Sequence, residues 1–145
     1  MKELTTQYFK NLQDQICLAL EKADSTGKFQ EDLWDRAEGG GGRSRIITNG
    51  SIIEKGGVNF SAVFGKTPEK ILKALKLEEA DFFATGVSIV IHPKSPMVPI
   101  IHMNVRFFEM SNGIRPQSVF NKLIFSNGIF SRGFALLRVL SPLGA

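Results

Sequence analysis

The chain has 145 residues, of which 43% are hydrophobic and 22% charged, a composition that excludes a wholly disordered chain and is typical of one globular domain. All 14 acidic residues lie at or before Glu109, so the formal charge of +4 reflects the basic residues that follow it. Scattered cations after an electrically balanced body do not form the basic patch that binds nucleic acids, and we expect no nucleic-acid partner.

No apolar stretch approaches the roughly 20 residues that span a bilayer, and the N-terminal residues lack the pattern of a secretory or transit signal. We therefore expect a cytoplasmic protein without a membrane span. Cys17 is the sole cysteine, which excludes an internal disulfide and a thiolate zinc site by count. Its place in a predicted helix indicates a half-buried structural thiol.

The first predicted element is an amphipathic helix over residues 5–23. Apolar side chains recur there at steps of three and four residues, whereas polar ones such as Gln13 and Asp14 are expected away from the apolar side. Residues 29–36 fit either a short strand or a turn, and both remain open. The apolar positions of the helix are Phe9, Leu12, Ile16, Leu20 and Ala23.

An antiparallel sheet is predicted to follow. Asn49-Gly50 lies within the run 46–53 and predicts a hairpin, because both residues accept the positive φ angles of a type I′ turn. Alternation over residues 58–64 predicts a third strand, and Thr67-Pro68 predicts the start of a second helix. This order of elements indicates an α+β fold, an antiparallel sheet flanked by helices.

Residues 86–93 and 98–107 predict two strands with apolar odd-numbered positions and polar groups at even-numbered ones. A five-residue loop, 93–97, would place Ser88 directly opposite His102. The even positions with chemically useful side chains are Ser88, His92, His102, Asn104 and Arg106.

This polar face has two interpretations, the ordinary solvent side of a sheet or the wall of a ligand cleft. Val90, Val98, Ile100 and Phe108 share the face with the polar groups. Apolar walls with a few convergent polar groups are typical of ligand clefts, so the pattern favours the second interpretation.

Four consecutive glycines, residues 39–42, are bracketed by Arg36, Arg43 and Arg45. The run lacks both the Lys-Ser/Thr of a phosphate-binding P-loop and the spacing of a dinucleotide-binding fingerprint. It is therefore a flexible linker, or an anion site whose arginines bind carboxylates through their planar guanidinium groups.

The chain carries, in order, the segments R-A-E-G-G-G-G-R-S-R, K-G-G-V-N-F-S-A-V-F-G, G-V-S-I-V-I-H-P-K-S-P-M-V-P and H-M-N-V-R-F-F-E. With this spacing, about residues 5–112 resemble the N-terminal part of the oxygen-dependent coproporphyrinogen III oxidase family. The resemblance implies an oxidoreductase of haem (porphyrin) biosynthesis that converts coproporphyrinogen III to protoporphyrinogen IX by oxidative decarboxylation of two propionates to vinyl groups. It also implies molecular oxygen as co-substrate, no organic cofactor, and a homodimer built on a large antiparallel sheet.

The resemblance also implies roles for residues that match the family's motifs. His102 corresponds to the proton donor, and Ser88 and the segment Asn104, Val105 and Arg106 correspond to substrate-contacting positions. His92 and His102 align with histidines sometimes assigned as ligands of a divalent metal. Arg106 is the main candidate to hold substrate propionates, with Arg43 and Arg45 as weaker candidates.

After residue 112 the sequence leaves the family pattern. We expect two parts, residues 1–112 as the N-terminal part of an oxidase-like domain and residues 113–145 as an atypical acid-free tail, frame-shifted or disordered. The family's C-terminal half does not follow, so the chain reads as truncated. Three function classes remain open: an oxidase fragment that needs a second chain, an inactive remnant that binds porphyrinogen, and an unrelated module that binds anions through residues 39–45.

Overall fold

The computed structural model describes residues 1–75, 79–111, 122–126 and 134–135. A long helix, α1, spans Lys2–Asp24, and a short one, α2, spans Glu69–Leu75. Seven strands form one antiparallel sheet whose spatial order follows the chain order. They are β1 (Gln30–Asp35), β2 (Gly40–Thr48), β3 (Ile53–Lys66), β4 (Asp81–Pro93), β5 (Ile100–Met110), β6 (Lys122–Ser126) and β7 (Phe134–Ala135).

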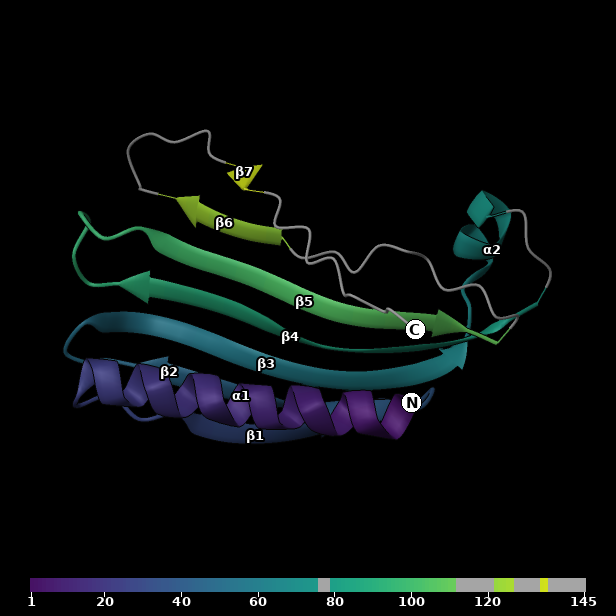
Figure 1. Cartoon of the computed structure of the whole chain (residues 1–145), viewed down its shortest axis with the longest axis horizontal. Helices are drawn as coiled ribbons and strands as arrows, with labels where there is room; N and C mark the ends of the chain where they lie inside the picture. Colours follow the sequence, from purple (N-terminus) through teal and green to yellow (C-terminus); the bar gives the residue numbers. More distant parts are fainter. Residues whose placement is uncertain (76–78, 112–121, 127–133, 136–145) are drawn as a thin grey trace, which may run out of the picture.

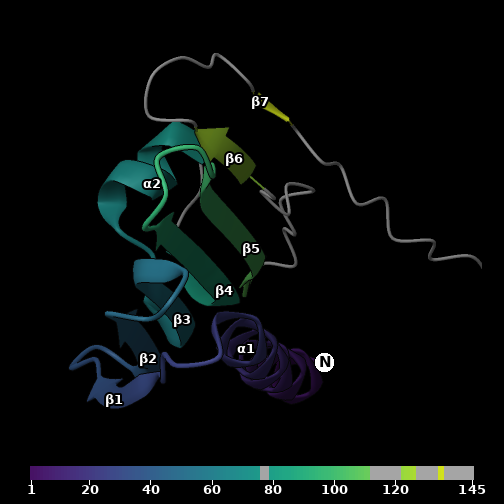
Figure 2. The same ribbon diagram turned by 90° about the vertical axis from the view of Figure 1, so that its left-hand side faces the viewer.

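Helix α1 lies along one face of the sheet, which we call the helix face, while α2 lies at the end of the sheet (Figures 1 and 2). The core forms between α1 and the sheet because apolar positions of both elements meet there. The α+β prediction is confirmed. The buried core cluster consists of Phe9, Cys17, Ile47, Ile53, Val58, Phe60, Val87, Ile89 and Ile91.

The predicted helix 5–23 is observed with a slightly longer extent, and Cys17 is buried at 4% exposure. The expectation for Gln13 is wrong, because this residue is fully buried against the sheet. Its Nε2 donates to the carbonyls of Arg43 and Val58, both at 2.7 Å, and its Oε1 accepts from Arg43 Nε at 2.7 Å. A buried amide with every polar atom bonded is stable in a core, which periodicity alone does not reveal.

Asp24 fixes the end of α1 to the loop between β2 and β3. Its carboxylate accepts backbone N–H groups from Gly27, Ser51, Ile52 and Ile53 at 2.7–2.9 Å. The hydrogen bond from Ile53 is the largest of the effects that hold the pKa of Asp24 well below its usual range, against the opposing effect of burial.

The hairpin predicted at residues 46–53 is present, but its turn is longer than Asn49-Gly50 suggested. Pairing ends at Thr48 and Lys55, Asn49 alone of the two turn residues has a positive φ, 56°, and Gly50 N donates to Ile53 O at 2.9 Å. The Asp24 carboxylate organises this wider loop. Gly50 is required for that contact, because a Cβ there would overlap the carboxylate.

The undecided stretch 29–36 contains β1, and the strand predicted over 58–64 is the middle of the longer β3. The second helix begins where Thr67-Pro68 predicted. The Thr67 hydroxyl is buried without a hydrogen-bond partner among the described residues, so it does not cap α2 through its side chain.

The predicted register between β4 and β5 is wrong by two residues. Ser88 lies opposite Asn104, and His102 lies opposite Val90. The last residues of β4 and β5 that pair with each other are Ile91 and Ile101, so nine residues, 92–100, separate the paired parts of the two strands instead of the five expected. A shift of two preserves the side of every residue, so the prediction of a shared polar face is confirmed.

Among the described residues, no helix is long and apolar enough to cross a bilayer. Of the tail predicted for residues 113–145, the structure describes only β6, which pairs with β5, and β7, which pairs with β6. The remainder of that prediction lies outside the described residues.

Candidate functional site on the open face of the sheet

The open face is the side of the sheet turned away from α1. The register places one polar residue from each of the first five strands directly beside the next, across the whole width of β1 to β5. The members of this row are Asp32, Ser44, Asn59, Ser88 and Asn104. Since opposed residues share a face and lie about 4.5–5.5 Å apart at Cβ, their side chains can contact one ligand together.

The histidines and Arg106 extend this polar row to either side. Arg106 lies one open-face position beyond Asn104, opposite Gly86, while His102 lies one position before it, opposite Val90. His92, opposite Lys55, is further along the same face of β4. Among the described residues, the side chains of Ser88, Asn104, His102 and Arg106 have no hydrogen-bond or ion-pair partner, so none is used to hold the fold.

Val105 is the exception among the predicted substrate-contacting residues. It lies opposite Val87 on the helix face and packs against the core cluster. Its side chain therefore points away from the open face, and only its backbone could take part in a contact there.

Two depressions hollow the open face. One, of about 400 Å³, is lined by Trp34, Asn59, Ser88, Asn104 and Arg106, among others. The second, of about 520 Å³, is lined by Lys55, Val90 and His92, among others. Ser44 and Asn59 line both, so the two depressions adjoin at the polar row.

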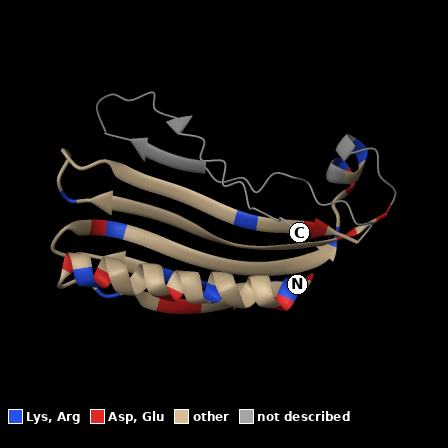
Figure 3. Cartoon of the chain, in the orientation of Figure 1, with Lys and Arg blue, Asp and Glu red and all other residues tan. Residues whose placement is uncertain are grey.

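Charge is sparse on this part of the molecule. Figure 3 shows that most of β3, β4 and β5 carries neither acids nor bases, with one basic stretch inside β5. A larger hollow of about 670 Å³ lies between α2 and the ends of β3 and β4, lined by residues such as Thr67, Glu69 and Asp81. It contains none of the predicted site residues, and we place the site on the open face.

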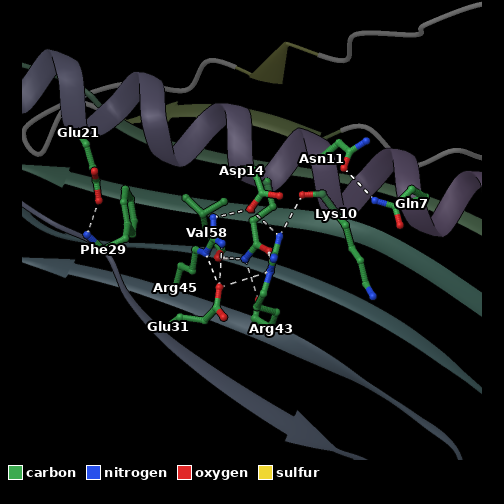
Figure 4. Close-up of polar contacts among 11 residues, drawn as sticks. Gln7, Lys10, Asn11, Asp14, Glu21, Phe29, Glu31, Arg43, Arg45 and Val58 are labelled. Carbon is green, nitrogen blue, oxygen red and sulfur yellow. Dashed lines mark hydrogen bonds and ion pairs between the residues drawn. The ribbon is translucent and has the colours of Figure 1, made fainter.

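Arg43 and Arg45 do not belong to this site, so their assignment as weaker propionate-binding candidates is wrong. Both lie on the helix face, where Asp14 accepts from Arg43 Nη2 at 2.8 Å and contacts Arg45 Nη1 at 2.7 Å (Figure 4). Glu31 accepts from Arg45 Nε at 2.8 Å. Burial alone would lower the pKa of Arg45, but the hydrogen bonds to Glu31 and Cys17 and the charge of Asp14 raise it.

The glycine run is therefore ordered sheet rather than a linker. Residues 40–42 belong to β2 and pair with β1 and β3. The anion-site interpretation of residues 39–45 also loses its two inner arginines, because both are already bound to carboxylates of this chain.

Trp34, Ser44 and Asn59 also line the site, but the sequence did not predict them. The signal for Asn59 was present, since it alternates with buried Val58 and Phe60 as Ser88 alternates with Val87 and Ile89. Trp34 lies in a stretch whose structure the sequence left undecided, and its place beside Gly42 follows only from the pairing of β1 with β2.

Comparison with known proteins shows the family of this chain. The family described as Coproporphyrinogen III oxidase matches residues 4–128. An oxygen-dependent coproporphyrinogen-III oxidase of Prochlorococcus marinus strain AS9601 is 50% identical over 110 residues, which cover 74% of this chain and 32% of the relative. The enzyme of the same name from strain NATL2A is 52% identical over 100 residues, covering 68% of this chain and 29% of the relative.

The chain thus spans about a third of the length of the curated relatives that it matches. The matched region includes every residue of the open-face site described above. Because the family match covers most of the sequence, this chain belongs to the coproporphyrinogen III oxidase family.

Proposed function

We propose that the open face of this chain binds coproporphyrinogen III and contributes to its oxygen-dependent oxidative decarboxylation. The observation that carries the proposal is the convergence of Ser88, Asn104, Arg106 and His102 on one face of β4 and β5. Identity of 50% to enzymes named for this reaction supports the same conclusion.

Each group has a chemical role in this proposal. Arg106 binds one substrate propionate through the two-pronged guanidinium, while the Ser88 hydroxyl and the Asn104 amide donate hydrogen bonds to a carboxylate. Conversion of a propionate to a vinyl group releases carbon dioxide, two electrons and one proton, and molecular oxygen accepts the electrons. His102 exchanges the proton, because imidazole is the side chain best suited to this task near neutral pH.

The described residues supply only some of the ligands that a divalent metal needs. His92 and His102 occupy diagonal positions on neighbouring strands of the open face, and they would supply two imidazole ligands. No group of three metal-binding side chains occurs among the described residues. Our proposal therefore assigns no step to a metal.

Binding without turnover is the second candidate function. His102 is exposed, whereas catalytic sites that handle reactive intermediates are covered and exclude water. The matched region covers only 32% of the relative from strain AS9601, so residues beyond this region, such as those of a companion chain, are proposed to complete the site for catalysis. The homodimer, the cytoplasmic location and the atypical character of residues 113–145 stay predictions within this proposal.

Two measurements test the proposal. Titration of the 145-residue chain with coproporphyrin III tests binding, and we expect saturable binding that Arg106→Gln weakens about tenfold or more. Formation of protoporphyrin from coproporphyrinogen III in air tests turnover, which His102→Gln should abolish. Binding that is unaffected by Arg106→Gln would contradict the proposed site, and binding without product formation would establish the second candidate.

A further inference from the structure

Arg36 is the one arginine flanking the glycine run that belongs to the open face. It continues the open-face positions of β1 after Trp34, and its N–H donates to Gly40 O at 2.8 Å. Arg43 and Arg45, by contrast, lie on the helix face. The turn between β1 and β2 therefore places a second arginine on the face that carries Arg106.

In the row that joins Trp34 to Arg106, strands β2, β3 and β4 carry only small side chains or none, and the Trp34 ring lies over Gly42. The register places Trp34, Gly42, Ser61, Gly86 and Arg106 in one row. The adjoining row contains Gly40, Val63, Ala84 and Phe108. Four strand spacings of about 4.8 Å separate β1 from β5, or about 19 Å between the two arginine backbones, a floor wide enough for a flat ligand.

The Arg36 side chain leans across this floor rather than out to solvent. Its guanidinium carbon lies 5.6 Å from the centre of the Phe82 ring, which stacks on Phe108 at 6.1 Å between centroids. A Cβ at Gly65 would lie 3.0 Å from Glu38 O, so this glycine lets the turn approach the open face closely. The Arg36 guanidinium thus lies over Phe82 on the open face, and Phe108, which stacks on Phe82, is two residues from Arg106 on the same face of β5.

The ion pair that holds Arg36 is weak enough to exchange. Arg36 Nε lies 3.0 Å from Glu38 Oε2, and the Glu38 side chain is 69% exposed. Exposed pairs of this kind contribute little to stability. A ligand carboxylate can replace Glu38 while the guanidinium keeps its stacking on Phe82.

We propose that Arg36 is a second carboxylate-binding residue of the open face, which holds a substrate propionate at the end of the site remote from His102. This inference rests on the proposed function. It assigns Arg106 and Arg36 to different propionates of one tetracarboxylate, with Glu38 as the internal carboxylate that the substrate displaces.

The test is titration of the chain with coproporphyrin III, comparing wild type with three variants. Arg36→Gln should weaken binding about three- to tenfold, because one charged hydrogen-bond pair is lost. Arg36→Lys should weaken binding less than Arg36→Gln does, since lysine keeps the positive charge but lacks the planar guanidinium. Glu38→Gln should strengthen binding about twofold or more, because it removes the competing carboxylate and leaves Arg36 free.

Opposite effects of Arg36→Gln and Glu38→Gln separate recognition from a structural role, because both changes break the same ion pair. Equal weakening by the two variants, or an affinity for Arg36→Gln within twofold of wild type, would overturn the inference. If Arg106→Gln still weakens binding in that case, the proposed function survives alone. No binding by the wild-type chain would overturn both.

Discussion

Ser88 and Asn104 lie directly opposite each other on β4 and β5, in the middle of the open face. Because both line the same depression, one bound carboxylate can accept hydrogen bonds from both. We predict that Ser88→Ala and Asn104→Ala each weaken coproporphyrin binding about three- to tenfold, equivalent to roughly 0.5–1.5 kcal/mol.

The double variant should lose less binding free energy than the two single variants lose together, since residues that share a ligand group are coupled. A double-mutant cycle by isothermal titration measures this coupling. Ser95→Ala is the matched control, because Ser95 lies in the loop between β4 and β5, outside both depressions. Strict additivity would contradict a shared ligand.

Arg106 and Arg43 should respond in opposite ways to the same substitution. Arg106→Gln is expected to reduce affinity for coproporphyrin while it changes the free energy of unfolding by less than about 0.5 kcal/mol. Arg43→Gln should destabilise the chain by about 1–2 kcal/mol, because Asp14 and Gln13 each lose a hydrogen bond from the guanidinium. It should leave the affinity for coproporphyrin within twofold. Urea unfolding and porphyrin titration of both variants measure the two quantities. Loss of affinity in Arg43→Gln alone would favour the anion module instead.

These contrasting arginines mark the limit of sequence reasoning. Alternation predicted the shared face of Ser88, His102 and Arg106 correctly, because strand periodicity does not depend on which residues pair. The three arginines around the glycine run could not be sorted in the same way. Their sides depend on β1, whose stretch was undecided, and on Asp14 and Glu31, which lie far from them in the sequence.

The interior position of Gln13 leads to a stability prediction. Gln13→Leu removes three hydrogen bonds and leaves the carbonyls of Arg43 and Val58 with fewer donors in the core. We expect a loss of about 1–3 kcal/mol in the free energy of unfolding, measured by urea denaturation followed by circular dichroism. Gln15→Leu, at an exposed position of the same helix, should change it by less than about 0.5 kcal/mol. Similar losses from both variants would contradict the role of Gln13.

Acid should destabilise the chain partly through Asp24. The folded-state pKa of Asp24 lies below its unfolded value of about 3.9, so its contribution is complete above that pH and is lost as the pH falls below it. Asp24→Asn should therefore lower the melting temperature at pH 7 and weaken its dependence on pH below about 4. Melting curves at several pH values measure both effects.

Glu21→Gln is the control for this prediction. Glu21 lies on the same helix, but among the described residues its carboxylate accepts a single backbone N–H, from Phe29, whereas that of Asp24 accepts four at 2.7–2.9 Å and a fifth, from Thr26, at 3.4 Å. The control should therefore shift the melting temperature less than Asp24→Asn does. If the melting temperatures of Asp24→Asn and of the wild type changed with pH in the same way, this account would be contradicted.

The loop lengths were the other part of the fold that the sequence did not settle. Asn49-Gly50 pointed to a two-residue turn, but the Asp24 carboxylate stabilises a wider loop from a distant helix end. The prolines after His92 marked a loop without fixing its first paired residues, and the register moved by two positions. In both places a contact or pairing distant in sequence decided the geometry.

The central claim is that the open face between β1 and β5 binds the porphyrinogen, and Trp34 reports on it directly. It is the sole tryptophan of the chain and lines the same depression as Ser88 and Arg106. Titration with coproporphyrin III, corrected for absorption with free N-acetyltryptophanamide, should quench its fluorescence saturably, and Arg106→Gln should raise the midpoint about tenfold. Unchanged Trp34 emission, while porphyrin absorbance reports binding, would contradict the claim because the ligand would then lie elsewhere.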